Sequence, residues 1–202
     1  MKAIKRISNM YTGLTLKLSH KGLHKSVKFR EPEFIKLGNS CTIGENSYLY
    51  CWRTYKYKDI IQQVHGSITI GDNFRATRNL TIQACGDLRI GDNVLIASNV
   101  FICDYNHGTD DVEDSYLNNE LTLSPVEICD GVWIGQGVYI LPGVTIGRNS
   151  IIGAGSVVTK SIPEYCIAVG NPAKVIKCYN SEEKCWSTAE RYNIDGEGIK
   201  RV

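Results

Sequence analysis

Histidine is the side chain whose ordinary pKa lets it exchange a proton near neutral pH, and this chain of 202 residues contains four. His20 and His24 lie in a basic N-terminal segment, and His65 precedes a stretch of regular repeats. His107 follows the sequence Asp-Tyr-Asn at the start of residues 104–127, which hold seven Asp and Glu and no Lys or Arg. Long loops on rigid scaffolds often carry functional side chains. His107 is therefore the first candidate for a general base.

The eight cysteines do not form a pattern typical of a metal site or of a disulfide framework. They are spread along the chain without a Cys-x-x-Cys pair, and residues 1–30 lack the apolar run of a signal peptide. We expect a cytoplasmic protein with reduced thiols, most of them packed as small buried apolar groups, and no requirement for a metal. The cysteines are Cys41, Cys51, Cys85, Cys103, Cys129, Cys166, Cys178 and Cys185.

The composition is that of a globular protein with an uneven charge distribution. Apolar residues make up 43% and charged residues 22%, and no apolar run approaches the roughly 18 residues that cross a membrane. Residues 1–30 carry eight Lys and Arg and no acid, so the other 172 residues, with 15 basic and 21 acidic groups, have a net charge of −6. The basic segment is either a solvated arm or a contact for an anionic membrane surface. It has no nucleic-acid-binding motif, so we expect no nucleic acid partner.

Aliphatic residues recur every six positions along much of the chain. A period of six is neither helical nor a simple alternation, and it predicts short strands separated by turns, with three such units in a coil of about 18 residues. Stacked coils bury one aliphatic column on each face, which defines a parallel β-helix. The repeat runs through Ile128, Ile134, Ile140, Ile146, Ile152 and Val158, and upstream through Ile70, Ala76, Ile82 and Leu88 and then Ile90, Ile96 and Ile102.

Two stretches interrupt the repeat, the aromatic and basic residues 52–66 and the acidic residues 104–127. The second interruption is not a multiple of six long, so we expect it to leave the coil as an excursion loop. The N-terminal region is ambiguous, because alternating leucines around residue 16 are typical of a strand, whereas residues 2–10 are compatible with one or two helical turns.

The C-terminal part is expected to contain a short helix. Ser181 is a suitable N-cap, and Glu182 and Glu183 would lie in the first turn of a helix over residues 181–191. The sequence thus predicts a basic appendage in residues 1–38, a β-helix domain in residues 39–170 and an extension in residues 171–202.

Several segments resemble the hexapeptide-repeat acyltransferases, in particular the galactoside and maltose O-acetyltransferases and the capsule and lipopolysaccharide O-acetyltransferases. The resemblance covers residues 67–178, over half of the chain. It implies an all-β, left-handed parallel β-helix, a homotrimer, and transfer of acetyl from acetyl-CoA at clefts between subunits. The matching segments are Ile90-Gly-Asp-Asn-Val-Leu-Ile-Ala, Val132-Trp-Ile-Gly, Ile140-Leu-Pro-Gly-Val-Thr-Ile-Gly, Ile152-Gly-Ala-Gly-Ser-Val-Val-Thr-Lys-Ser-Ile-Pro and Gly170-Asn-Pro-Ala-Lys.

The resemblance also implies catalytic roles. His107 matches the catalytic histidine of the family, and Glu120 matches a glutamate that orients the imidazole in the sugar acetyltransferases. Asp104 or a backbone carbonyl could orient the ring instead. A backbone N–H after Trp-Ile-Gly stabilises the oxyanion in the family, and here it belongs to Gln136, where the identity of the side chain does not matter.

The positions that match the cofactor site of the family lie along successive coils. Small residues there let the pantetheine arm approach the backbone, and basic residues after the proline-containing turn meet the nucleotide phosphates. The family often has arginine at both basic positions, whereas this chain has lysine, a point charge rather than a bidentate fork. The expected acetyl-CoA contacts are Trp133, Gly135, Ala154, Thr159, Lys174 and Lys177.

The acceptor site is less well defined by the resemblance. Thr77 stands where the galactoside enzymes have an asparagine that contacts the sugar, so this chain departs from the galactoside pattern at that position. The expected acceptor contacts are Thr77, Arg78, Asn79, Gln83 and Tyr105.

Together these patterns predict an acetyl-CoA-dependent O-acetyltransferase that acts on a sugar hydroxyl in surface polysaccharide biosynthesis. An antibiotic acetyltransferase of the streptogramin or chloramphenicol type is a second interpretation, because streptogramin enzymes share an Asn-His pair like Asn106-His107. A non-enzymatic scaffold that binds partners along its flat faces is a third. A γ-type carbonic anhydrase is disfavoured, because it needs three histidines around a metal and only His65 and His107 lie in or near the repeat.

Overall fold

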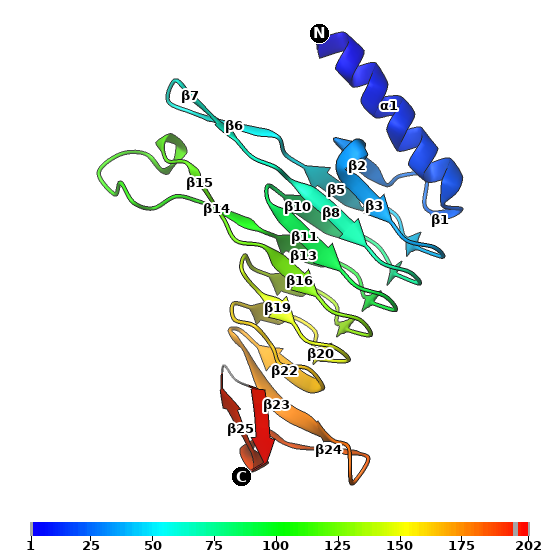
Figure 1. Cartoon of the computed structure of the whole chain (residues 1–202), viewed down its shortest axis with the longest axis vertical. Helices are drawn as coiled ribbons and strands as arrows, with labels where there is room; N and C mark the ends of the chain where they lie inside the picture. The colour runs from blue at the N-terminus through cyan, green and yellow to red at the C-terminus, as the bar shows by residue number, and fades with distance from the viewer. Residues whose placement is uncertain (1, 196–197, 202) are drawn as a thin grey trace.

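The computed structural model describes residues 2–195 and 198–201, with side chains described from residue 10 to residue 190 except at residue 11. Within this part of the chain, short strands stack coil upon coil into an elongated column with three sheets as its faces (Figure 1). The nine-stranded sheet contains, in spatial order, β1 (Gly22–Leu23), β4 (Thr42–Ile43), β9 (Arg75–Ala76), β12 (Leu95–Ile96), β17 (Trp133–Ile134), β20 (Ile151–Ile152), β22 (Cys166–Gly170), β23 (Ala173–Asn180) and β24 (Cys185–Thr188).

The other two long sheets also take one strand from each coil. The six-stranded sheet contains β2 (Lys28–Arg30), β5 (Tyr48–Cys51), β10 (Thr81–Ala84), β13 (Phe101–Cys103), β18 (Tyr139–Ile140) and β21 (Val157–Val158). The five-stranded sheet contains β3 (Ile35–Leu37), β8 (Ser67–Ile70), β11 (Asp87–Ile90), β16 (Val126–Ile128) and β19 (Thr145–Ile146).

The strand register confirms the six-residue repeat as the origin of the fold. Ile134 pairs in parallel with Ile152, and Ile140 pairs in the same way with Val158, 18 residues further along the chain. All four side chains have 0% exposure. Each aliphatic residue therefore lies directly above its counterpart in the next coil, and the columns form one continuous hydrophobic core.

Asp and Asn side chains hold the turns of neighbouring coils together. The carboxylate of Asp92 accepts the N–H of Asp72 at 2.7 Å, and Asp130 accepts the N–H of Asp92 at 3.0 Å. Asn73 and Asn93 both have positive φ, which asparagine tolerates better than most residues, and their side-chain amides hydrogen-bond at 3.2 Å. The repeated Gly-Asp-Asn turns thus satisfy backbone groups that the short strands leave unpaired.

The N-terminal region is a helix followed by the first coil. The leucines near residue 16 do not form a strand, because α1 (Lys2–Ser19) runs through them and packs Leu16 against the core. Residues 22–37, which the prediction placed in the appendage, supply β1, β2, η1 (Pro32–Phe34) and β3. These strands cap the hydrophobic columns, so the β-helix begins near Gly22 rather than at residue 39.

The outer face of α1 is apolar and exposed. Met10, Leu14 and Leu18 are four residues apart, and 67%, 51% and 71% of their surfaces are exposed. No helix in the described residues is long and apolar enough to span a bilayer.

The predicted helix over residues 181–191 is wrong. β24 (Cys185–Thr188) pairs antiparallel with β23 and places Ser187 opposite Cys178, followed by η3 (Ala189–Arg191). The open edge of β23 offers backbone partners to this segment, and the side chains of Tyr179 and Trp186 pack edge to face at 5.4 Å. Tertiary pairing overrides the local helical signal. A terminal hairpin of β25 (Tyr192–Asp195) and β26 (Gly198–Arg201) follows.

Both interruptions of the repeat form antiparallel hairpins that leave the column on the same side (Figure 1). The first hairpin consists of β6 (Thr54–Tyr57) and β7 (Ile60–Gln63). The second consists of β14 (Tyr105–His107) and β15 (Leu121–Leu123), and its long connection contains η2 (Tyr116–Asn118). The excursion that the sequence predicted over residues 104–127 thus contains a hairpin, and it projects from the column beside the first hairpin.

Candidate active site

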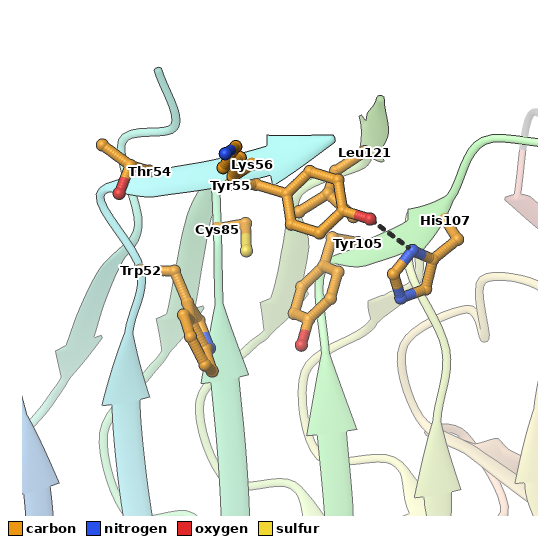
Figure 2. Close-up of a pocket in the computed structure, with 8 residues that line it drawn as sticks. All are labelled: Trp52, Thr54, Tyr55, Lys56, Cys85, Tyr105, His107 and Leu121. Atoms are coloured by element: carbon orange, nitrogen blue, oxygen red, sulfur yellow. Dashed lines mark hydrogen bonds between the residues drawn. The ribbon is translucent and has the colours of Figure 1, made fainter. Parts of the chain in front are cut away.

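His107 lies at the outer end of β14, where the second hairpin meets the first. Its Nδ1 atom is 3.2 Å from the hydroxyl of Tyr55 on β6, and the two rings meet edge to face with centroids 5.5 Å apart. Figure 2 shows the other ring nitrogen of His107 turned away from Tyr55. Among the described residues, no side chain or backbone group hydrogen-bonds to that second nitrogen, Nε2, so it is available to exchange a proton with a bound molecule.

Hydrogen bonds from Gln62 dock the first hairpin onto the second. The side-chain oxygen of Gln62 accepts the N–H of Leu121 at 2.7 Å, and its side-chain nitrogen donates to the carbonyl of Leu121 at 2.9 Å. Leu121 pairs with His107 in the β14–β15 ladder. At the tip, Lys58 and Asp114 form an ion pair at 3.1 Å. Together these contacts hold Tyr55 beside His107.

A cavity of about 290 Å³ opens between the two hairpins, with His107 at its edge (Figure 2). Trp52, Tyr55, Tyr105 and Leu121 form its largely apolar walls. The hydroxyl of Tyr105 donates to the side-chain oxygen of Gln83 at 2.6 Å, which fixes the ring. Burial raises the pKa of Tyr105 to about 12, so this phenol stays neutral.

The indole of Trp52 and the thiol of Cys85 are the next two groups in the cavity wall. The guanidinium of Arg30 lies 3.5 Å from the ring centroid of Trp52, while the buried indole N–H of Trp52 has no hydrogen-bond partner among the described residues. Burial raises the pKa of the Cys85 thiol to about 12, so Cys85 is not a thiolate nucleophile at neutral pH. The remaining lining residues are Thr54 and Lys56.

Asp104 stabilises the base of the second hairpin rather than orienting His107. It has 0% exposure, and its two carboxylate oxygens accept the backbone N–H groups of Cys85 at 2.7 Å and Gly86 at 2.9 Å. Its backbone carbonyl accepts the N–H of Ser124. Asp104 therefore ties the hairpin to the preceding coil, and of the two alternatives considered for orienting the imidazole, this one does not match the structure.

Glu120 is exposed and immediately precedes β15, whose first residue, Leu121, pairs with His107. Its backbone carbonyl accepts the N–H of Gly108 at 2.8 Å. Among the described residues, the side-chain partner of Nδ1 in His107 is Tyr55 and not Glu120. A role for Glu120 in orienting the ring stays a prediction.

Other predicted residues share a different corner of the column, between the nine-stranded and six-stranded sheets. The backbone carbonyl of Gln136 accepts the N–H of Gly155 at 2.8 Å. Gly155 follows Ala154 in the next coil. Thr77 bonds to Ser98 through their hydroxyls at 2.8 Å. Above them, Asn79 bonds to Asn99 at 2.7 Å and Arg78 lies 3.7 Å from Glu45. The predicted oxyanion donor and three of the predicted acceptor contacts thus form one ladder of turns.

The predicted cofactor residues follow the lower coils. Trp133 is 49% exposed on β17. A Cβ on Gly135 would lie 2.6 Å from the backbone nitrogen of Ala154, so the close stacking of these coils requires glycine there. Thr159 lies at the corner that follows the six-stranded sheet, and Lys174 and Lys177 are exposed on β23.

The chain is similar in sequence and in structure to known proteins. Residues 125–160 match the sequence model of the family described as "Bacterial transferase hexapeptide (six repeats)". Galactoside O-acetyltransferase of Escherichia coli K12 is 43% identical over 143 residues, which are 71% of this chain and 66% of that protein. A solved galactoside acetyltransferase in complex with coenzyme A is 35% identical with a TM-score of 0.60, and the match covers 83% of this chain and 74% of that one. The chain belongs to the hexapeptide-repeat acetyltransferases.

A second relative of this hexapeptide-repeat acetyltransferase is the putative lipopolysaccharide biosynthesis O-acetyl transferase WbbJ of Escherichia coli K12. It is 40% identical over 131 residues, which are 61% of this chain and 67% of that protein. In the first three curated relatives the match spans 66%, 40% and 56% of their own length. Within the described residues, no group of three or more His, Cys, Asp or Glu side chains is arranged to hold a metal ion.

One chain does not bring the predicted site residues together. The backbone of Gly137, next to Gln136, bonds to Ser98, and His107 comes nine residues after Ser98 along β13 and β14. Nine extended residues at about 3.3 Å each span at most about 30 Å, and β13 together with the start of the second hairpin lies between the two corners. Of the predicted acceptor contacts, only Gln83 and Tyr105 lie at the corner of His107.

The contribution of the first hairpin to the site was not predicted from the sequence. Tyr55, Trp52 and Gln62 all lie in residues 52–66, which were expected only to interrupt the repeat. The available signal was that this aromatic and basic stretch breaks the same repeat as the acidic stretch that contains His107.

Proposed function

We propose that the protein is an acetyl-CoA-dependent O-acetyltransferase that acetylates a hydroxyl group of a sugar in the biosynthesis of a surface polysaccharide. The observation that carries this proposal is the position of His107, which lines an aromatic-walled cavity and whose Nε2 atom is unbonded among the described residues. The family membership supports acetyl-CoA as the acetyl donor. It also implies that the column is a left-handed β-helix.

The proposed reaction is general-base catalysis of acyl transfer. Nε2 of His107 takes the proton of the acceptor hydroxyl as its oxygen attacks the thioester carbon. The carbonyl oxygen becomes an oxyanion, which accepts the backbone N–H of Gln136. When the tetrahedral intermediate collapses, the carbon–sulfur bond breaks, and the imidazolium returns its proton to the CoA sulfur. The products are the acetyl ester and free CoA.

The exposed residues of the C-terminal coils are suited to bind acetyl-CoA. Ala154 and Gly155 form an exposed turn, and a Cβ on Gly155 would meet no atom within 4 Å, so a pantetheine arm can lie against the backbone. Trp133 offers an exposed ring on β17, which pairs with β20, the strand that precedes this turn. Lys174 and Lys177 supply positive charge for the nucleotide phosphates.

The separation of the two corners supports a homotrimer with its sites between subunits. His107 and the Gln136 backbone act on the same thioester in the proposed reaction, yet within one chain β13 separates the two corners on which they lie. A second copy that places its Gln136 corner against the His107 corner of the first completes the site.

The aromatic cavity supports a sugar acceptor. Pyranose rings present apolar C–H faces that pack on aromatic rings, and polar edges that hydrogen-bond. Trp52, Tyr55 and Tyr105 provide such faces. The volume of about 290 Å³ suits one sugar unit at the reacting position.

The exposed apolar face of α1 supports peripheral attachment at the cytoplasmic membrane surface, where lipid-linked glycans are assembled. Met10, Leu14 and Leu18 would insert, and the basic residues of the first 30 positions would meet anionic headgroups. Co-sedimentation with anionic but not with zwitterionic vesicles is the expected result, and equal recovery with both would contradict this attachment.

An acceptor screen tests the proposed function. The full chain is incubated with acetyl-CoA and galactosides, glucosides, amino sugars, chloramphenicol or a streptogramin, and the free thiol of CoA is measured. We expect release with a sugar and a loss of at least about 100-fold in His107→Ala, since a general base contributes 10²–10⁴ in rate. Release with an antibiotic alone would favour the resistance enzyme. Absence of acetyl-CoA binding in calorimetry would favour the scaffold.

A further inference from the structure

The Tyr55 hydroxyl lies between two groups that constrain its single hydrogen. It is 3.2 Å from Nδ1 of His107 and 3.3 Å from the backbone carbonyl oxygen of Leu117. Tyr55 comes from the first hairpin, whereas the other two residues come from the second. This three-member chain of hydrogen bonds therefore forms only when both hairpins are docked.

The direction of these hydrogen bonds follows from elementary chemistry. A carbonyl oxygen can only accept, so the Tyr55 hydroxyl donates its one hydrogen to Leu117. The Tyr55 oxygen is then left as an acceptor toward His107, which requires a proton on Nδ1. A neutral imidazole with a proton on Nδ1 has an unprotonated Nε2. The opposite tautomer would leave the Leu117 carbonyl without this hydrogen bond.

The surroundings of Tyr55 hold its hydroxyl in place. Its ring stacks on Tyr57 with centroids 6.1 Å apart and an interplanar angle of 17°. The double hydrogen bond between Gln62 and Leu121 fixes the hairpin on the strand that pairs with His107. The position of the hydroxyl is thus set by packing and by backbone hydrogen bonds rather than by the histidine alone.

We propose that Tyr55 is the positioning residue of the active site, which holds His107 with its proton on Nδ1 so that Nε2 is the base. This inference rests on the proposed function, because it assigns a partner to the base of that reaction. Tyr55 does not exchange a proton with the substrate. It keeps the imidazole in the one tautomer that can remove the hydroxyl proton, and it stabilises the imidazolium that forms.

The direct test is the tautomer of His107 in the Tyr55→Phe variant. The full chain is labelled with ¹⁵N in its histidines, and the side-chain nitrogen shifts are recorded at a pH above the imidazole titration, with His107→Ala to assign the signals. We expect the Nδ1–H tautomer in the unmodified protein and a shift toward Nε2–H in Tyr55→Phe. Tyr57→Phe removes the same hydroxyl from the same strand, and it should leave the spectrum unchanged.

Kinetics give the second readout. Tyr55→Phe should lower kcat on the order of 10-fold to 100-fold, while the KM for acetyl-CoA stays the same, because the hydroxyl orients the base and does not bind the donor. An unchanged tautomer in Tyr55→Phe would overturn the proposal, whatever happens to kcat. So would an unchanged kcat in a variant whose tautomer has shifted. The spectrum needs no substrate, so a protein that lacks acetyltransferase activity but shows the shift would refute the proposed function and not the Tyr55–His107 contact.

Discussion

At the scale of single residues, the site depends on which polar group each side chain contacts. Tyr55 contacts His107, whereas the buried Asp104 contacts backbone N–H groups at the base of the same hairpin. Both side chains come from segments that break the repeat. In the proposed site Tyr55 positions the imidazole of His107, and Asp104 stabilises the hairpin that carries His107.

Asp104→Asn should destabilise the protein at neutral pH. A carboxylate accepts both N–H groups of Cys85 and Gly86, but an amide can accept only through its oxygen and leaves one buried donor unsatisfied. We expect a loss of about 1–3 kcal/mol in the free energy of unfolding, measured in urea. Asp110→Asn removes the same charge from an exposed position and should change the value by less than about 0.5 kcal/mol. Equal effects of the two changes would contradict the role of Asp104.

Asp104 also makes stability depend on pH. Burial raises its pKa above the ordinary value of 3.8, although the N–H groups of Cys85 and Gly86 oppose the shift. The native state therefore binds the proton more tightly than the unfolded chain, and this contribution to stability is present below about pH 3.8 and lost as the pH rises through the raised pKa. The free energy of unfolding of the unmodified protein should fall relative to that of Asp104→Asn over this range.

At the scale of elements, two hairpins far apart in the sequence form one arm. β7 docks on β15 through the side chain of Gln62, and the cavity lies between the hairpins. The column itself needs neither hairpin, because its strands pair continuously from coil to coil. The arm can therefore be loosened without loss of the fold.

Gln62→Ala should undock the first hairpin. The N–H of Leu121 then loses its acceptor, so its hydrogen exchange should become faster, and kcat should fall as Tyr55 leaves His107. Mass spectrometry of peptides around Leu121 measures the exchange. Gln63→Ala changes the exposed neighbour on the same strand and should have neither effect. Unchanged exchange at Leu121 in Gln62→Ala would show that other contacts dock the hairpin.

At the scale of the whole molecule, the corner with His107 and the corner with Gln136 face different directions. The turns at each corner hydrogen-bond from coil to coil, and such a ladder aligns residues along the column axis rather than around it. Residues at different corners can share a reaction only if another copy of the chain brings its own corner close. The proposed mechanism thus requires at least a second copy of the chain, which the predicted trimer would supply.

Mixed assemblies test this requirement. His107→Ala and the double variant Lys174→Glu/Lys177→Glu should each be inactive, the first through loss of the base and the second through repulsion of the CoA phosphates. If each site combines His107 of one subunit with the lysines of another, co-expression should restore activity at about a quarter of the sites. Light scattering should give a mass of three times 22.5 kDa. No recovery in a verified mixed trimer would place His107 and the two lysines of each site in the same subunit.

The sequence alone determined the column and the candidate base. A repeat of six residues is local information, because each buried aliphatic side chain and each turn lie within a few residues of one another, so the register of Ile134 on Ile152 could be predicted. His107 could be found because it begins the longest break in that repeat and matches the family motif.

Only the tertiary structure decided what surrounds His107. Tyr55 lies 52 residues before it, and their contact depends on how two hairpins pack, which no local pattern encodes. The same reason explains the error over residues 181–191, where the open edge of β23 drew a helix-like sequence into a strand. Pairing between distant segments depends on which backbone edges and apolar faces the finished column leaves unsatisfied.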